Sequence, residues 1–457
     1  MKFATFVLCA SIYVAAAFSA VAATGKADSL ALAANKAPTN TSLNLQAGRA
    51  LYEAGLNKRA MGYLSRGGND AQPWLALVEF EDYQFDKAQE RAEKYLASKH
   101  NTESAEHALA QEVIDKVNLA RTMLDRVEKV QIIDSIVVPR DEFFKAYRIS
   151  PSTGSVASTS VLPKDLKSAA NTTVYVSENG ERMMWGQTEA NGNVNVVESN
   201  HLADGTWETP HSLGSNLPLG GNANYPFLLS DGITLYYASD GEGSLGGYDI
   251  YITRNDGDRY LNPQNLGMPY NSPMDDYLLA IDDATGAGWW ATDRNLIPDS
   301  VTIYVFVPQD LRDNYPVDGT PDLVDRARIT SIKATQQPGK DYASVLNAIK
   351  NVNRPQGNET SSSVAFALAM PDGRVLHSLS DFTEPEASEM MEGYLQEIDD
   401  FTNRTEALKV LRRKYAAGDS SVADEIRNEE VELEQLRIQL RHLQNDVIKA
   451  EMRNTGL

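Results

Sequence analysis

The sequence is almost without cysteine. Cys9 is the only one among 457 residues, and it lies inside the apolar N-terminal run. It follows Leu8 and precedes most of that run, whereas a lipid-attachment cysteine closes such a run behind a small residue. The rest of the chain therefore has no thiol for a disulfide, for a cysteine metal site or for a cysteine nucleophile.

Long apolar runs are equally scarce. One stretch, Phe3 to Thr24, carries no charge, follows a basic residue and ends in small residues that include Ala20 and Ala22. This pattern is typical of a cleaved secretory signal. The alternative is a membrane anchor, for which the run has marginal length. We expect a signal peptide at residues 1–23, a flexible lead-in at 24–41 and no transmembrane segment after cleavage. The chain would then be exported to the periplasm, with association with the outer membrane as an open alternative.

Positive charge is in short supply. The chain has 42 Lys and Arg against 63 Asp and Glu, which gives a formal charge of −21. Binding to nucleic acid needs a basic surface, so this balance argues against a nucleic-acid partner. It argues equally against electrostatic docking on anionic lipid. Solubility is a sufficient reason for the excess of acidic residues.

Motifs for catalysis are missing as well. Gly241 to Gly246 fits G-x-G-x-x-G, but a dinucleotide site needs that loop to open a helix. The residues that follow, Tyr248 to Thr253, alternate like a strand. Ser244 lacks a nucleophile elbow, because Glu242 stands where the leading glycine is needed. We therefore interpret this segment as a loop between strands.

The aspartates and histidines that could bind a metal do not have the spacing of a metal site. The aspartate pairs Asp275-Asp276 and Asp282-Asp283 have the chemistry for Ca²⁺ or for acid–base work, but adjacent aspartates between strands are typical of chain reversals. The histidines are scattered and form no ligand pattern: His100, His107, His201, His211, His377 and His442. The sequence predicts no catalytic, cofactor-binding or metal-binding residue, and a protein that is not an enzyme.

Helical periodicity dominates residues 42–129. Apolar and small residues recur three and four apart, which predicts one buried stripe per helix. The segments Leu51 to Leu56 and Tyr83 to Ala88 resemble the tetratricopeptide repeat, in about two degenerate copies. The resemblance implies antiparallel helix pairs and does not indicate a ligand. A plain helical bundle is the alternative.

Three related units of strand-like segments lie within residues 130–334. Turn residues lead into apolar runs in each unit: Asn179-Gly180 before Arg182 to Gly186, Asp231-Gly232 before Leu235 to Ala238, and Thr285-Gly286 before Trp289 to Thr292. Several short strands per unit, repeated, are typical of a β-propeller. Three units are few for closure. Either Val130–Pro163 and Val364–Leu379 supply further strands, or the assembly is open.

The second unit resembles the bacterial PD40 repeat, which is WD40-like and of the TolB type. It matches at Ser230, Asp231, Gly232, Leu235, Tyr236, Tyr237, Ser239, Gly246, Gly247, Asp249, Ile250 and Tyr251. The other two units match loosely. Trp289 and Trp290 recur where the second unit has aromatics, so packing inside a sheet explains them. A sugar-stacking site is the alternative, and these two residues are the candidate ligand-binding pair.

The C-terminal third contains mixed signals and then helices. In residues 335–384 we expect a linker and a hairpin around Pro371 to Gly373. Tyr342 to Ile349 in the same region looks helical. Just before this region, Ala327 to Ala334 alternates like a strand. The helical spacing of apolar residues in 385–457 predicts a helical hairpin. Its second helix would begin at a capping box of Ser421 and Asp424. The apolar stripe of that helix has heptad spacing: Leu433, Leu436, Leu440, Leu443, Val447 and Ala450. A homodimeric coiled coil, with self-association through these helices, is the alternative.

The predicted fold class is multidomain α + β, with TPR-like helices, propeller-like repeats and a C-terminal helical hairpin. This order resembles cell-envelope proteins of Bacteroidota, among them scaffold subunits of the type IX secretion apparatus. Those join the first two modules to an OmpA-like domain, which this chain lacks. The sequence predicts a non-enzymatic envelope scaffold that binds other envelope proteins. A propeller that binds a glycan or peptide, and an accessory or lyase-type propeller, are the alternatives.

Overall fold

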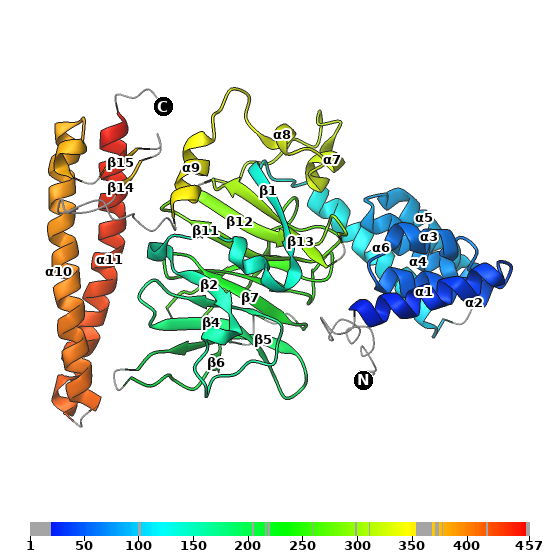
Figure 1. Cartoon of the computed structure of the whole chain (residues 1–457), viewed down its shortest axis with the longest axis horizontal. Coiled ribbons are helices and arrows are strands. Elements are labelled where there is room, and N and C mark those ends of the chain that lie inside the picture. Colours follow the sequence, from blue (N-terminus) through cyan, green and yellow to red (C-terminus); the bar gives the residue numbers. More distant parts are fainter. Residues whose placement is uncertain are drawn as a thin grey trace.

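The computed structural model describes residues 20–98, 102–202, 205–214, 217, 220–257, 259–297, 299–309, 311–352, 368–370, 374–376, 378–416 and 419–453. A helical array, a group of antiparallel sheets and a long helical hairpin lie side by side (Figure 1). The mixed α + β class is thereby confirmed. Most of the predicted signal peptide and the turn Pro371 to Gly373 lie outside the described residues.

Six helices form the N-terminal array: α1 (Ala20–Lys36), α2 (Thr41–Glu53), α3 (Asn57–Leu64), α4 (Gln72–Glu81), α5 (Phe85–Ala97) and α6 (Ala105–Leu124). Successive helices pack against one another through their apolar faces, as the periodicity predicts. Helix α1 covers most of the segment predicted to be a flexible lead-in. The reason is a stripe of small residues on α1, Ala27, Ala31 and Ala34, which is buried beside α2.

Three antiparallel sheets follow. The first has the order β2 (Ser155–Ser158), β3 (Thr173–Val176), β4 (Arg182–Thr188), β5 (Val194–Asn200) and β6 (His211–Ser212). The second has the order β7 (Ala223–Leu228), β8 (Thr234–Ser239), β9 (Asp249–Arg254) and β10 (Gln264–Asn265). The third has the order β11 (Asp276–Asp282), β12 (Ala287–Thr292), β13 (Ser300–Val307) and β1 (Gln131–Pro139).

Strand β1 precedes the first sheet in the chain but belongs to the third. It pairs antiparallel with β13, from Gln131 opposite Val307 to Pro139 opposite Ser300. The short helix η2 (Arg140–Ala146) then contacts β1, β13 and β2, so it lies between the third and first sheets. Of the two segments predicted to supply further strands, Val130–Pro163 does so through β1 and β2, whereas the described part of Val364–Leu379 joins none of the three sheets.

The sheets share one hydrophobic core. Strand β7 packs against β3, β4 and β5 of the first sheet, and β11 packs against β7, β8 and β9 of the second. Aromatic rings from different segments meet there: Tyr225 stacks on Tyr277 with ring centroids 4.8 Å apart, and Phe143 of η2 meets Tyr277 edge-on at 5.3 Å. Burial of these rings holds the sheets and η2 together.

Three short helices cover one end of the sheets: α7 (Leu323–Arg328), α8 (Ile332–Thr335) and α9 (Ala343–Asn351). Helix α9 confirms the helix predicted there. The strand predicted at Ala327 to Ala334 is wrong. Ile329 ends α7 in the left-handed conformation (φ 60°), and the Ser331 side chain accepts a hydrogen bond from the Ala334 amide to start α8. Two helix ends so close together mimic an alternating pattern.

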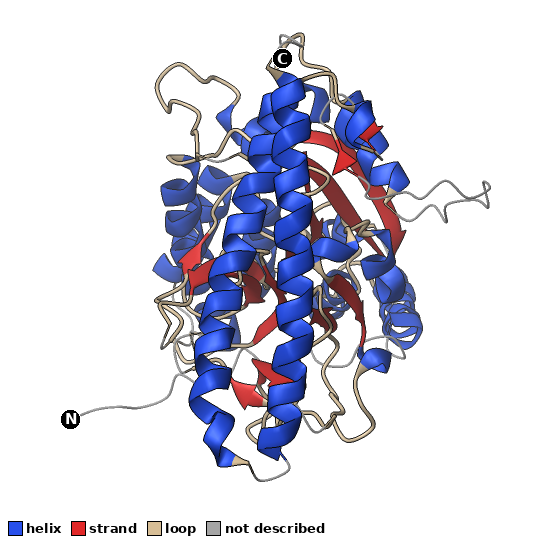
Figure 2. Ribbon diagram, turned by 90° about the vertical axis from the view of Figure 1, so that its left-hand side faces the viewer, coloured by secondary structure: helices blue, strands red, loops and turns tan. Residues whose placement is uncertain are grey.

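The C-terminal region begins with a small two-stranded sheet, β14 (Leu368–Ala369) and β15 (Val375–Leu376), which pair with each other. The predicted hairpin is thus confirmed within the described residues, and it joins none of the three sheets. Helices α10 (Pro385–Ala416) and α11 (Ala423–Met452) then run side by side (Figure 2). The stripe of α11 is buried at Leu433, Leu436, Leu440, Val447 and Ala450.

The predicted capping box of α11 is wrong. A short turn, η6 (Ser420–Val422), precedes the helix, and Val422 occupies the N-cap without a side-chain hydrogen bond. The Ser421 hydroxyl instead donates to Asp419, together with its own amide, which makes a local turn. None of the helices in the described part of the chain combines the length and the apolar character needed to cross a bilayer.

Candidate functional site: the contact between helical array and sheets

The glycine-rich loop between β8 and β9 is held in place by Asp249. The buried carboxylate of Asp249 accepts hydrogen bonds from Leu245 N at 2.9 Å, Gly246 N at 3.1 Å and Asn265 Nδ2 at 2.7 Å. Burial raises the pKa of Asp249 to about 7. Gly246 is required, because a Cβ there would lie 2.1 Å from the carbonyl oxygen of Met274. Strand β9 follows directly, which confirms the predicted loop between strands.

This loop carries the helical array. Leu245 and Met268 are fully buried, and they belong to the hydrophobic cluster formed by α4, α5 and α6. Lys116 Nζ of α6 donates to the carbonyl oxygen of Gly246 at 3.2 Å, and Glu128 N donates to that of Met268 at 3.0 Å. We call Leu245, Gly246 and Met268 the seat of the array. The array and the sheets therefore share a hydrophobic interior.

A carboxyl group with a raised pKa lies on the array beside the seat. Glu81, at the end of α4, accepts hydrogen bonds from Asn57 Nδ2 at 2.5 Å and from the Tyr52 hydroxyl. Burial raises the pKa of Glu81 to about 7; the charge of Asp275 acts in the same direction, and Lys116 opposes it. The charge of Asp275, just before β11 of the sheets, therefore acts on the pKa of Glu81 in the array.

Asp275 is the corresponding carboxyl on the sheets. Its Oδ1 accepts a hydrogen bond from Tyr248 N at 2.8 Å, at the end of the glycine-rich loop. A Cβ on Gly247 would lie 2.1 Å from the same oxygen, so the loop and Asp275 are in close contact. Burial raises the pKa of Asp275 to about 7, and the charge of Asp293 adds to the rise.

Asp293 connects this group to η2. Arg140 Nη1 donates to Asp293 Oδ2 at 2.6 Å, and the Tyr277 hydroxyl donates to Asp293 Oδ1 at 3.3 Å. Burial raises the pKa of Asp293, while Arg140 counteracts the rise. The site therefore contains four carboxyl groups of raised pKa: Glu81 at the end of α4, Asp249 at the start of β9, Asp275 before β11 and Asp293 after β12. Arg140 partly compensates for the last of these.

The chemistry of this site is proton binding and hydrogen bonding. Each of its carboxylates is engaged by protein donors, and the described residues contain no group of three or more His, Cys, Asp or Glu that could hold a metal ion. The other aspartates singled out in the sequence fix structure. Asp276 pairs with Arg294 at 2.7 Å, and Asp282 accepts hydrogen bonds from Ser150 and Thr153, each at 2.6 Å.

The tryptophan pair lies elsewhere. Trp289 and Trp290 are 1% and 0% exposed, and as neighbours on β12 they enter different clusters. Trp289 packs near Tyr147, with ring centroids 6.4 Å apart, whereas Trp290 packs against Tyr304 at 5.0 Å and Phe306 at 5.3 Å. A sugar stacks on an exposed ring face, and neither indole has one in this conformation.

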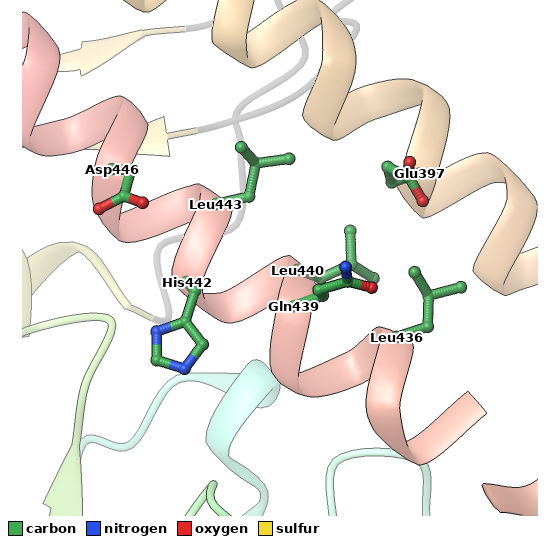
Figure 3. A pocket seen from close by; sticks show the side chains of 7 residues that line it. All are labelled: Glu397, Leu436, Gln439, Leu440, His442, Leu443 and Asp446. Atoms are coloured by element: carbon green, nitrogen blue, oxygen red, sulfur yellow. The ribbon is translucent and has the colours of Figure 1, made fainter. Parts of the chain in front are cut away.

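A separate cavity of about 270 Å³ lies along α11 and is shown in Figure 3. Leu436, Leu440 and Leu443 project from α11 into the space toward Glu397 of α10, while His442 points away from α10. The cavity is largely apolar and carries no assembled group of reactive side chains. We regard it as a gap in the packing of the hairpin.

Sequence reasoning identified the glycine-rich loop but missed its partner. The usable signal was Leu245, a lone large apolar residue among glycines and polar residues, which a solvated loop has no need to contain. Asp275 was treated as a chain-reversal residue, and Glu81 and Arg140 were not singled out. Contacts between residues so far apart in the chain leave no local pattern.

Comparison with known proteins gives no further guide. No family model matches the chain, and no significant similarity was found to curated proteins or to solved structures. A function for this chain must therefore be argued from its own residues.

Proposed function

We propose that the protein is a non-enzymatic scaffold of the cell envelope, exported by its N-terminal signal, that holds other envelope proteins on its surfaces. The observation that carries the proposal is the buried contact between the array and the seat residues Leu245, Gly246 and Met268. Leu245 of the glycine-rich loop and Met268 after β10 are both buried in the hydrophobic cluster of α4–α6, which would hold the array and the sheets as one unit. A rigid unit with separate outer surfaces suits a protein that fixes the spacing between partners.

The sheets support a propeller-like interpretation of this unit. The first sheet from β3 onward, the second and the third each consist of antiparallel strands, four in a row. In the third sheet the outermost strand, β1, comes from the other end of the repeat region. This pairing brings a strand from the beginning of the repeat region beside one from its end, as a radial arrangement with protected edges would require. The resemblance of the second unit to the PD40 repeat agrees with this interpretation.

The array supports a tetratricopeptide-like interpretation. Helices α2 and α3, and then α4 and α5, pack together as successive pairs. Small residues lie where the helices approach: Ala47, Ala60, Ala76, Ala88 and Ala92 are all fully buried. Arrays of this type commonly present surfaces to other proteins.

The C-terminal hairpin is proposed to brace this scaffold or to dock it in an outer-membrane or secretion-associated assembly. Its apolar stripe is buried within the hairpin, at Leu433, Leu436 and Leu440 among others. An internal partner for the stripe reduces the need for a second copy of the chain. Partner contacts would then use the outer faces of α10 and α11.

Site-specific photo-crosslinking in the host envelope tests the scaffold function. A photoreactive residue is placed at Leu32, Val137 or Val431, which are 64%, 53% and 55% exposed and lie on the array, the third sheet and the hairpin. We expect a discrete protein adduct from at least one position. Leu64, which is fully buried, is the matched control and should give none. No adduct from any exposed position, with the protein present at its native level, would contradict the proposal.

A further inference from the structure

Two equivalent positions in the repeats hold neighbouring sheets together, and they differ in one chemical group. Before β7, Asn222 Oδ1 accepts a hydrogen bond from Val194 N at 2.8 Å, at the start of the third strand in the preceding unit. Before β11, Asp275 Oδ1 accepts one from Tyr248 N, also at 2.8 Å and also beside the third strand of the preceding unit. Asn222 and Asp275 thus perform the same task.

The second partner of each residue is equivalent as well. Asp240, which follows β8, donates its amide to the carbonyl oxygen of Asn222 at 3.3 Å, and Asp293, which follows β12, donates its amide to that of Asp275 at 2.9 Å. The side chains differ. Asn222 Nδ2 donates to Asp240 Oδ2 at 2.6 Å, whereas an ionised Asp275 has no hydrogen to donate to the carboxylate of Asp293.

Because an amide serves at the equivalent position, the fold does not require a carboxyl group there. We propose that Asp275 is a proton-binding site that controls how firmly the glycine-rich loop holds the helical array. A proton on Asp275 supplies the donor that Asn222 provides permanently. Its loss leaves Asp275 charged within electrostatic range of Asp293, where the second unit has a hydrogen bond between Asn222 and Asp240.

The chain of contacts from Asp275 to the array is short. Asp275 binds Tyr248 N and touches Gly247, and the next residue, Gly246, accepts the hydrogen bond from Lys116 of α6. Leu245 then enters the core of the array. A weaker contact between Asp275 and Tyr248 should therefore also loosen the contacts of Gly246 and Leu245 with the array.

Charged groups face Asp275 from every side. Asp293 with Arg140 of η2 lies on one side, Asp276 with Arg294 adjoins it in the chain, and Glu81 of α4 approaches from the array. Lys116, paired with Glu112 at 3.3 Å, lies beside Glu81, and Asp249 holds the other end of the loop. Acidic groups outnumber basic ones around Asp275, and this favours its protonated form.

Two effects on Asp275 oppose each other. The hydrogen bond from Tyr248 N favours the ionised form, whereas burial and the charge of Asp293 disfavour it and prevail, which raises the pKa of Asp275 to about 7. A carboxyl whose pKa is higher in the folded state contributes stability that is complete below its unfolded value and is lost as pH rises through the folded value. The hold on the loop should therefore be strong at pH 6 and weak at pH 8.

Hydrogen exchange of single amides tests the proposal on the full chain. After correction for the intrinsic rate, we expect the protection of the Tyr248 amide to fall by about tenfold between pH 6 and pH 8, the change for one proton released at pH 7. The Val194 amide, bound to the uncharged Asn222, is the internal control and should not change. In Asp275→Asn the change at Tyr248 should shrink by about tenfold; any remainder, shared with the Leu245 amide, belongs to Asp249 and Glu81.

The reciprocal variant Asn222→Asp should confer the pH dependence on Val194, which keeps the test open even if Asp275→Asn folds poorly. The proposal is overturned if Tyr248 and Val194 respond alike in the wild-type protein, or if Asp275→Asn retains the full change at Tyr248. It is equally overturned if Asn222→Asp leaves Val194 without any dependence on pH.

Discussion

The helical array and the C-terminal hairpin are attached to the same sheets in different ways. The array is joined through buried residues, with Leu245 and Met268 inside its hydrophobic cluster. At the hairpin, an ion pair joins Arg412 of α10 to Glu181, just before β4 of the first sheet, at 3.8 Å, with both side chains about a third exposed. Burial of apolar surface is worth several kcal/mol, whereas an exposed ion pair is worth about 0–1 kcal/mol. The array should therefore be fixed, and the hairpin should be the part that moves.

The largest expected effect comes from truncating Leu245, the buried side chain of the seat. Leu245→Ala should lower the free energy of unfolding by about 2–5 kcal/mol, because it removes a fully buried side chain and leaves a cavity. Urea unfolding measures the change, and limited proteolysis between the array and the sheets should become faster. Leu311→Ala, at a leucine that is 82% exposed, is the control and should change stability by less than about 0.5 kcal/mol. Equal effects would mean that the array is not held by its seat.

A second effect is on the pH dependence of stability. Burial raises the pKa of Glu81, Asp249 and Asp275 to about 7, so the stability they contribute is lost as pH rises from about 5 to 8. Unfolding at the two pH values should differ by about 1–3 kcal/mol, with the protein weaker at pH 8.

Glu81→Gln should reduce that difference, because the glutamine has no charge to bury. The exposed Glu53, on α2, provides the matched substitution Glu53→Gln, which should leave the difference as it is. A protein that is more stable at pH 8 than at pH 5 would contradict this account of the interface.

A third, smaller effect concerns the polar contacts of the array. Arg328 of α7 pairs with Asp82 at 2.7 Å, and both side chains are nearly half exposed. Arg328→Ala should cost about 0.2–1 kcal/mol, and less at high salt. Chemical unfolding at low and high ionic strength measures it. A loss above about 2 kcal/mol would show that surface charges, and not the seat, attach the array.

The smallest effect is expected at the hairpin. Arg412→Ala should leave the unfolding midpoint of the sheets unchanged, because the pair with Glu181 is long and partly exposed. Small-angle scattering should at the same time show a wider spread of hairpin positions. If the variant unfolds the sheets at lower urea, the hairpin is a structural part of the core, and the contrast between the two attachments fails.

The contrast also separates what the sequence could predict from what it could not. Helices α2 to α6 and the hairpin were predicted because apolar residues repeat every three or four positions, a purely local pattern. Val130 to Val138 was correctly predicted as the first β segment, but its pairing with β13 depends on residues far along the chain.

The errors have local causes. Ile329 takes a left-handed conformation that joins two short helices, and Ser421 turns toward Asp419 instead of capping α11. The site was hidden for another reason. Glu81, Arg140 and Asp275 come together only when the array, η2 and β11 have assembled, so no window of sequence contains them.

The position of β1 has a consequence for how the protein is made. The strand is synthesised before all the others of the sheets, yet its partner β13 is the last of them to appear. Until then β1 exposes an unpaired edge rich in valine and isoleucine, and such edges are where chains aggregate. Pairing between distant segments is also slow, because the intervening loop must be closed first. A newly made chain would therefore pass through a period in which β1 needs shielding, and chaperones that bind extended apolar segments are suited to provide it.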